Sequence, residues 1–452
     1  MSMQTTGDRG HWGSRLGFIL AASGSAVGLG NIWRFPYITG ENGGAAFVFI
    51  YLLCVVLIGL PLLINELALG RASGKNPVGA FRGTREGTPF VITGFLCVIL
   101  CFVVLSYYSV IAGWTIGYAL STVMGKKLVF ADFVSNATLM LPLLAVFLGF
   151  TALIVQAGVQ KGIERWSKIL MPLLLLLVLI IIGRSVTLEG AMAGVSYYLK
   201  PDFSKLNGEV FLMALGQAFF SLSVGWGLMI TYGSYMPKQQ NMVSGGVWVA
   251  FTDTMVAILG GFMVFPAVFA FGMDPASGPA LTFQTLPAVF EKMPAGGLVA
   301  VIFFLLLSIA ALTSSISMLE VPVSYLLDEK KASRTAAAWI VAGCAFVFGV
   351  PSALSNGGSR FFSDMELFGQ TGFLNIVDYA FGTILVVVIS LLCSVYVGWV
   401  WKTRSAIREI AEGAPGFDNG KAVSLAKIWA FFIRFVCPLV IGYVLYQKLF
   451  GG

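Results

Sequence analysis

The sequence predicts an all-α protein that crosses a membrane about eleven times. Hydrophobic residues make up 58% of the 452 residues and charged residues only 11%, which leaves too little polar surface to cover a water-soluble globule. Uncharged apolar runs of about 20 residues, the length needed to cross a bilayer, recur along the whole chain. Backbone amides in hydrocarbon must be hydrogen-bonded internally, so these runs form helices or a closed barrel. Their unbroken apolarity differs from the alternation of barrel strands and favours helices.

The apolar runs set the approximate bounds of the spans. We expect them at residues 14–38, 44–70, 90–122, 138–157, 166–186, 210–235, 243–272, 297–327, 335–351, 376–401 and 427–447. This divides the chain into an N-terminal segment (1–13), a ten-helix core (14–401), a loop (402–426) and an eleventh helix with the C-terminal end (427–452).

The distribution of Lys and Arg predicts the orientation. Most of the 28 basic residues fall in segments that lie on one side if the N-terminus is on that side. Basic loops stay in the cytoplasm, so we expect a cytoplasmic N-terminus, an external C-terminus and a place in a bacterial inner membrane. The net charge of +7 then reflects topology and not binding to nucleic acid.

The residues that most enzymes use are scarce. His11 is the only histidine, so the chain lacks the residues for a histidine-rich metal cluster or a Ser-His-Asp triad. We therefore expect that the protein is not an enzyme. The six cysteines fall within apolar runs and lack metal-site spacing. We expect them to be buried thiols, and they are Cys54, Cys97, Cys101, Cys344, Cys393 and Cys437.

Glycine clusters interrupt the first and sixth spans. Val-Gly-Leu-Gly at 27–30 and Val-Gly-Trp-Gly at 224–227 lie 197 residues apart, close to half the chain. Each glycine inside a helix costs about 1 kcal/mol relative to alanine. Five spans separate the start of one interrupted span from the start of the other, and this odd number makes the second copy run inverted. The repeats are about 14–186 and 210–401.

Paired broken helices are typical of inverted-repeat secondary transporters. Unwinding at the bilayer midplane frees carbonyl oxygens for a cation, and the new helix N-termini favour a carboxylate. The alternative is that the glycines only permit close helix packing. Two matched glycine clusters, at the same depth in the two halves of the chain, favour the transporter interpretation over simple close packing.

Further motifs make the chain similar to the neurotransmitter:sodium symporter family, and most similar to its bacterial transporters of hydrophobic amino acids. The matches cover spans one to ten, although the family usually has twelve spans. They are His11-Trp12, Ala-Val-Gly-Leu-Gly-Asn at 26–31, Arg-Phe-Pro at 34–36, Glu-Asn-Gly-Gly at 41–44, Tyr-Tyr at 107–108, Gly-Gln-Ala-Phe-Phe-Ser-Leu-Ser at 216–223 and Leu-Thr-Ser-Ser-Ile at 312–316.

The resemblance implies two sodium sites made of oxygen ligands. The first would use carbonyls of Ala26 and Ser221 and side chains of Asn31, Ser221 and Asp253. The second would use carbonyls of Gly24, Val27 and Ala310 and the hydroxyls of Thr313 and Ser314. By themselves, the last two hydroxyls could equally bond to their own helix.

The resemblance also implies an amino-acid site beside the first break. The substrate carboxylate would meet the amides of Leu29 and Gly30 and the hydroxyl of Tyr108. The ammonium group would meet carbonyls of Ala26, Phe220 and Ser223. The apolar side-chain pocket, which favours aliphatic or aromatic L-amino acids, would be lined by Val104, Tyr108, Phe220, Trp226, Ser317 and Met318.

The residue at position 28 indicates whether the substrate is an amino acid or a monoamine. Monoamine transporters of the family place an aspartate there as a counter-ion, so glycine implies a substrate with its own carboxylate.

The resemblance further implies two gates and a hinge. Arg34 and Asp378 match an outer pair, and Arg9 and Asp328, beside Trp12, match an inner pair. The alternative for the inner pair is a solvated ion pair worth under about 1 kcal/mol. Gly162 and Pro172 match a hinge that unwinds in the fifth span, and an ordinary proline kink is the alternative.

Two acidic residues complete the expectations. Glu66, charged within a span, is expected in the polar network near the first sodium. Ala257 stands where chloride-dependent relatives have a serine, while Tyr51 and Gln217 remain. Asp253 would supply the negative charge instead, so we expect no chloride dependence.

The expected function is sodium-coupled import of hydrophobic amino acids through alternating access. A channel or sensor of the same fold is the alternative, and the complete set Asn31, Ser221, Thr313 and Ser314 favours the symporter. Its partners would be the substrate, sodium and the lipid bilayer, with no obligatory protein partner.

Overall fold

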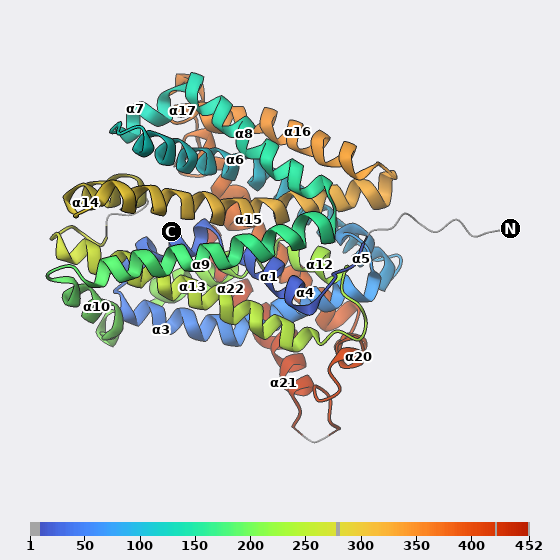
Figure 1. Ribbon diagram of the computed structural model, residues 1–452. Coiled ribbons are helices and arrows are strands. Elements are labelled where there is room, and N and C mark those ends of the chain that lie inside the picture. Colours follow the sequence, from blue (N-terminus) through green and yellow to red (C-terminus); the bar gives the residue numbers. More distant parts are fainter. Residues whose placement is uncertain (1–9, 277–280, 421–422, 451–452) are drawn as a thin grey trace.

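A computed structural model describes residues 10–276, 281–420 and 423–450. Helices dominate these residues, and the described strands are β1 (Glu366–Leu367) and β2 (Gln370–Thr371), which form one antiparallel pair. Long helices lie side by side along one direction, with short helices at both ends of the bundle (Figure 1). The predicted all-α membrane fold is confirmed.

Nine helices of the described part are long and apolar enough to cross a membrane. Five of them are single helices: α6 (Val91–Val123), α8 (Ala137–Gln156), α13 (Met242–Ala270), α15 (Gly296–Lys330) and α16 (Arg334–Leu354). The other four join consecutive elements: α3 (Ala45–Cys54), η2 (Val55–Gly59) and α4 (Leu60–Ser73); η3 (Val159–Glu164) and α9 (Arg165–Val186); α18 (Phe373–Val377), η6 (Asp378–Leu385), α19 (Val386–Val395) and η7 (Tyr396–Val400); and α21 (Leu425–Phe431), η8 (Phe432–Val436) and α22 (Cys437–Phe450). The other two predicted spans, the first and the sixth, are broken helices.

The first broken span consists of α1 (Arg15–Ala26) followed by η1 (Gly30–Arg34) and α2 (Phe35–Glu41), bent by 51°. The sixth consists of α11 (Gly208–Ser221) and α12 (Leu228–Gly233), each too short to span alone. Between these halves the chain takes left-handed φ angles at Ser223 (54°), Gly225 (83°) and Gly227 (75°). Glycine adopts such angles without strain, which explains why the chain can leave the helix here.

Short helices mark the two ends of the bundle (Figure 1). The end near the described N-terminus, called the N-terminal face below, carries α5 (Pro77–Thr84) and α20 (Thr403–Gly413). The opposite face carries α7 (Phe130–Ser135), α10 (Ala191–Leu199), α14 (Leu286–Lys292) and α17 (Arg360–Ser363). The remaining short elements are η4 (Phe203–Lys205) and η5 (Leu281–Thr285).

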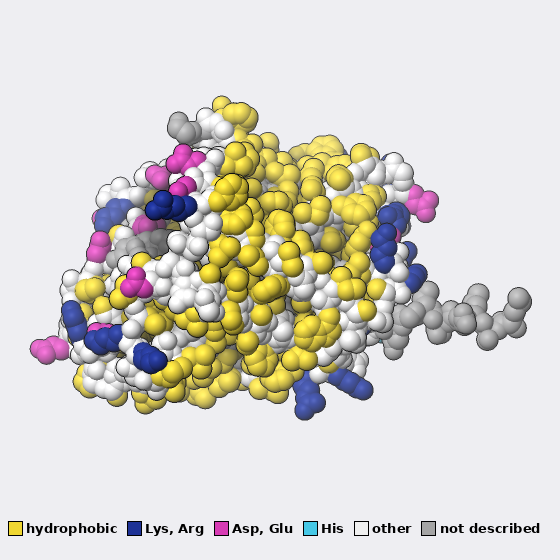
Figure 2. Space-filling model, turned by 90° about the horizontal axis from the view of Figure 1, so that it is seen from above, with side chains coloured by type: hydrophobic (Ala, Val, Ile, Leu, Met, Phe, Trp, Pro, Cys, Tyr) yellow, Lys and Arg dark blue, Asp and Glu magenta, His cyan; other side chains and the backbone are white. Residues whose placement is uncertain are grey.

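On the face shown in Figure 2, hydrophobic side chains cover the middle of the molecule, and charged side chains gather toward its two ends. Large apolar side chains on the spans point outward, such as Leu176, Val347 and Leu439, which is 73% exposed. Lipid tails are the solvent that makes such exposure favourable.

One cysteine departs from the expectation of buried thiols. Cys344 on α16 is exposed, whereas Cys54, Cys97, Cys101, Cys393 and Cys437 are buried. The reason is helix position: α16 packs against α6 and α8 with one side only, and Cys344 lies on the outward side.

Candidate functional site

The two broken helices meet inside the bundle. The Ser223 hydroxyl donates to the carbonyl of Ser25 at 3.2 Å. The Asn31 amide donates to the Ser221 hydroxyl at 3.0 Å. Residues almost 200 positions apart in the sequence are therefore in direct contact, and both breaks lie in the protein interior.

The side chains of Asn31, Ser221 and Asp253 form a first oxygen-rich cluster. The Asn31 amide donates to Asp253 Oδ1 at 2.7 Å, and the Ser221 hydroxyl donates to Oδ2 at 2.7 Å. Asp253 is fully buried on α13, and no basic residue of the described part forms an ion pair with it. A buried carboxylate without a positive partner favours a bound cation. Ala26, the remaining residue predicted for this site, is buried at the end of α1.

A second cluster joins α1 to α15. The hydroxyls of Thr313 and Ser314 each lie 3.4 Å from the carbonyl of Val27. Thr313 also donates to the carbonyl of Ala310 at 2.9 Å, and its Cβ lies against Gly24. The structure thus brings all five predicted residues together. Because Thr313 bonds to its own helix as well, the hydroxyl alone does not decide between the two interpretations.

The residues predicted to hold the substrate's carboxylate also converge. The hydroxyl of Tyr108 accepts a hydrogen bond from the backbone amide of Leu29 at 3.3 Å. A Cβ atom on Gly28 would collide with the Ser314 hydroxyl and lie 3.1 Å from the Tyr108 hydroxyl. A Cβ atom on Gly30 would lie only 2.8 Å from the Phe220 ring. Both glycines are therefore required for the close packing around this point.

Aromatic rings and small side chains lie beyond this point. The rings of Phe220 and Trp226 are 5.7 Å apart in a T-shaped contact. Ser317 is hydrogen-bonded to the hydroxyl of Tyr232 at 2.7 Å, and Val104 and Met318 are buried nearby on α6 and α15. The sequence reasoning missed Tyr232, because nothing local shows that α12 presents it to α15.

A cavity of about 340 Å³ leads from this region toward the opposite face. Leu29, Tyr108 and Phe220 line its inner part, and further residues of η1, α6, η6, α7 and η5 also line it. Several aromatic side chains of this cavity were not predicted, and they are Trp33, Tyr37, Trp114, Phe130 and Phe283.

The predicted outer gate residues line this same cavity without pairing. Arg34 donates to Gln217 at 3.1 Å, and its guanidinium lies 4.8 Å from the centre of the Phe220 ring. Asp378 accepts from the hydroxyl of Tyr107 at 2.8 Å. Within the described residues no ion pair joins Arg34 to Asp378, because each has found another polar partner beside the cavity.

The N-terminal face is closed by Trp12. Its indole donates to the carbonyl of Tyr232 at 3.0 Å, and its backbone amide donates to the carbonyl of Tyr235 at 3.2 Å. Asp328 accepts from the backbone and side chain of Asn76 at 2.8 and 2.9 Å. Its predicted partner Arg9 lies outside the described residues.

A buried ion pair beside this closure was also missed. Arg334 binds Glu320 through both terminal nitrogens, at 2.7 and 2.8 Å, and Tyr235 donates to the same carboxylate. Glu320 alone in an apolar span was a visible signal for it.

The predicted hinge is wound. Gly162 lies in the π-helical turn Val159–Glu164, and Pro172 lies inside α9. A Cβ atom on Gly162 would collide with the carbonyl of Ile154, so this turn is tightly packed. Glu164 also accepts hydrogen bonds from Gly13 and Ser14 at 2.7 and 2.9 Å, which ties the turn to the start of α1.

Glu66 lies at the second break. Its carboxylate accepts a hydrogen bond from the backbone amide of Gly225 at 2.6 Å. The unwound segment exposes this amide, and span two passes next to it. Around the first cluster the Tyr51 hydroxyl contacts Ser221 at 3.3 Å, and Gln217 donates to the carbonyl of Gly30 at 2.8 Å.

A helical membrane core with two broken helices, whose breaks gather carbonyl, hydroxyl and carboxylate oxygens, defines a secondary transporter. The chain belongs to the sodium:neurotransmitter symporter family, whose family model matches residues 9–136 and 132–450. It is therefore a sodium-dependent symporter of the membrane.

Similar proteins match nearly the whole chain. The sodium-dependent transporter YhdH of Bacillus subtilis is 40% identical over 97% of this chain and 97% of its own length. A sodium-dependent transporter of Haemophilus influenzae is 36% identical over 97% of this chain and 98% of its own. The crystal structure of MhsT in complex with L-phenylalanine superposes with a TM-score of 0.88 at 40% identity, covering 97% of this chain and 100% of MhsT.

Proposed function

We propose that this protein imports hydrophobic L-amino acids, aliphatic or aromatic, together with sodium. The observation that carries the proposal is the contact of Leu29 and Tyr108 beside Gly28. A backbone amide and a phenol hydroxyl lie at the end of a cavity, at the start of a half-helix. These are donors suited to a carboxylate, and no acidic side chain occupies position 28 to oppose it.

The chemistry of the neighbouring side chains supports the hydrophobic part of the substrate. Val104, Phe220, Trp226 and Met318 offer apolar contacts, and the Ser317 hydroxyl is already bonded to Tyr232. A charged side chain would lose its hydration here without gaining a partner. That the similar structure of MhsT holds L-phenylalanine agrees with this class.

Two sodium sites are proposed at the two oxygen-rich clusters. The first contains the buried Asp253 carboxylate and the second has neutral oxygens only. Both proposed sites include residues at the first break, so an ion at either site would stabilise the same unwound segment that contacts the substrate. This shared element is how sodium binding and substrate binding would be coupled.

Exposed basic side chains support a cytoplasmic N-terminal face in a bacterial inner membrane. Arg15, Lys75 and Arg82 are exposed on elements of that face. Positive loops remain on the cytoplasmic side. The cavity that reaches Tyr108 and Phe220 would then open to the outside, as import requires.

Uptake into proteoliposomes tests the proposal. We expect labelled leucine, phenylalanine and tryptophan to accumulate when sodium is outside, and not when choline replaces sodium. Labelled glutamate, lysine and dopamine should stay at the level of protein-free liposomes. Sodium-driven accumulation of dopamine, or of the charged amino acids alone, would contradict the substrate class.

A further inference from the structure

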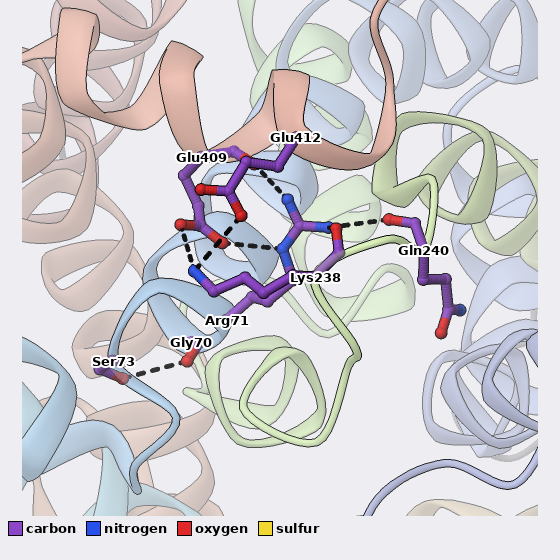
Figure 3. Close-up of polar contacts among 7 residues, drawn as sticks. All are labelled: Gly70, Arg71, Ser73, Lys238, Gln240, Glu409 and Glu412. Atoms are coloured by element: carbon purple, nitrogen blue, oxygen red, sulfur yellow. Dashed lines mark hydrogen bonds and ion pairs between the residues drawn. The ribbon is translucent and has the colours of Figure 1, made fainter.

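A buried arginine joins three segments on the N-terminal face that are far apart in the sequence (Figure 3). Arg71, near the end of α4, has a fully buried side chain that binds the Glu409 carboxylate on α20 at 2.8 Å. It also binds the backbone carbonyl of Glu409. Its remaining contacts are to the carbonyls of Lys238 and Gln240, at 3.1 and 2.7 Å.

The charges of this cluster balance. Lys238 forms an ion pair with Glu409 at 2.6 Å and lies 3.8 Å from Glu412 (Figure 3). Two basic and two acidic side chains therefore compensate one another around the buried guanidinium. Such a group is retained in a low-dielectric site only when its hydrogen-bonding groups are satisfied, and removal of one partner leaves an uncompensated charge. The contact is therefore sensitive to single changes.

The shape of the contact is as specific as its charges. Gly413, at the end of α20, lies so close to the connecting segment that a Cβ atom would collide with the carbonyl of Gln240. Gly70, next to Arg71, approaches the carbonyl of Ile230 on α12 in the same way. The segment 234–241, which follows α12, is thus held between α4 and α20.

This segment begins at the docking site of Trp12. The two carbonyls that hold Trp12 belong to Tyr232, in the last turn of α12, and to Tyr235, in the segment that follows it. The carbonyls bound by Arg71 follow three and five residues after Tyr235. The position of the end of α12 therefore depends on Arg71 from one side and determines whether Trp12 can dock from the other.

We propose that Arg71 is a positioning residue for closure of the N-terminal face, and that α20, outside the ten-helix core, is a working part of that closure. The proposal rests on the proposed function. Trp12 leads into α1, whose end contacts the second oxygen-rich cluster and carries Ala26, a proposed ligand of the first sodium. If Arg71 no longer holds the segment 234–241, Trp12 docks less often, α1 loosens and sodium affinity falls.

Three variants test this from different directions. Arg71→Gln removes the guanidinium, and Glu409→Gln keeps the size of the side chain but removes the charge. Gly413→Ala changes no charge and pushes α20 away from Gln240. Arg82→Gln is the matched control, since it breaks an exposed ion pair of 2.9 Å with Glu329 on the same face.

The measurements are hydrogen exchange of the Trp12 backbone amide in sodium and the sodium concentration for half-maximal uptake. If the docked state falls to about a tenth of its population, the sodium concentration for half-maximal uptake rises by about tenfold, because apparent affinity follows the competent fraction. Exchange of the Trp12 amide becomes faster in the same variants, because it follows the undocked fraction, which grows. We expect this in every folded variant of the three and wild-type values in Arg82→Gln. Wild-type exchange and sodium dependence in Glu409→Gln and Gly413→Ala would overturn the proposal.

A lower melting temperature with unchanged exchange and sodium dependence would also overturn it, because the cluster would then be only structural. The two proposals can fail separately. If the wild type shows no sodium-driven uptake, the proposed function fails, while exchange at Trp12 still reports whether Arg71 controls closure.

Discussion

The side-chain amide of Asn31 donates to the carboxylate of Asp253 at 2.7 Å, which ties the first broken helix to the middle of α13. A second bond from the same amide reaches the backbone carbonyl of Asp253 at 3.0 Å. The amide oxygen of Asn31 accepts from the backbone of Gly28 at 3.1 Å. One asparagine therefore connects the buried acid, the unwound segment and the expected substrate contact.

Asp253→Asn should weaken sodium coupling. The substitution keeps the size of the side chain but replaces a charged oxygen ligand with a neutral one in a buried site. We expect the sodium concentration for half-maximal uptake to rise by about tenfold, which corresponds to about 1.4 kcal/mol. Uptake measured over a sodium series, with the melting temperature as a control for folding, checks this. An unchanged sodium dependence would remove Asp253 from the site.

Chloride provides a separate test of the same charge. Wild-type uptake should not change when gluconate replaces chloride, because Asp253 already supplies the negative charge. Ala257 lies one helical turn beyond Asp253, and Tyr51 contacts Ser221 beside it. Asp253→Asn combined with Ala257→Ser should therefore make uptake depend on chloride. A wild type that requires chloride would contradict the argument, and so would a fully active double variant that ignores it.

Removal of both hydroxyls from the second cluster should abolish concentrative uptake. In Thr313→Ala with Ser314→Ala, two of the five proposed oxygen ligands are lost in a buried region where water cannot easily replace them. The fold should survive, because both substitutions only shorten small side chains. Uptake with and without a sodium gradient is the measurement, and Ser308→Ala on the same helix is the control. Sodium-driven uptake in the double variant would exclude this cluster as a sodium site.

Substitutions at position 28 should separate the effect of an added negative charge from the effect of added size. The structure shows that any Cβ atom there meets the Ser314 hydroxyl, so Gly28→Asp alone would mix both effects. We expect Gly28→Asn to reduce uptake through crowding. Gly28→Asp should reduce it further, by at least about tenfold, because a second carboxylate would face the substrate's own. Comparing half-maximal substrate concentrations of the two variants measures the charge effect. Equal values would show that the substrate carboxylate does not approach residue 28.

The sequence by itself determined the helical membrane fold, the approximate position of its long apolar spans, and the two breaks. Apolar length is set by the thickness of the bilayer, and the breaks follow from glycines such as Gly225 and Gly227, which adopt left-handed angles without strain. These are local properties of the chain. The meeting of Asn31 with Asp253 was also expected, but only because the motifs resemble a known family.

Only the tertiary structure decided which partners the interior charged groups take. Arg34 binds Gln217 and Phe220 instead of Asp378, and Glu66 binds the amide of Gly225. In the sequence, Arg71 is one of several basic residues near the end of a span. Only its contact with Glu409 on α20 distinguishes it from the others. Each buried charged group has several possible partners, and the partner that it binds depends on distances between segments far apart in the sequence. Residue types and spacing cannot supply those distances, because packing of the whole bundle sets them.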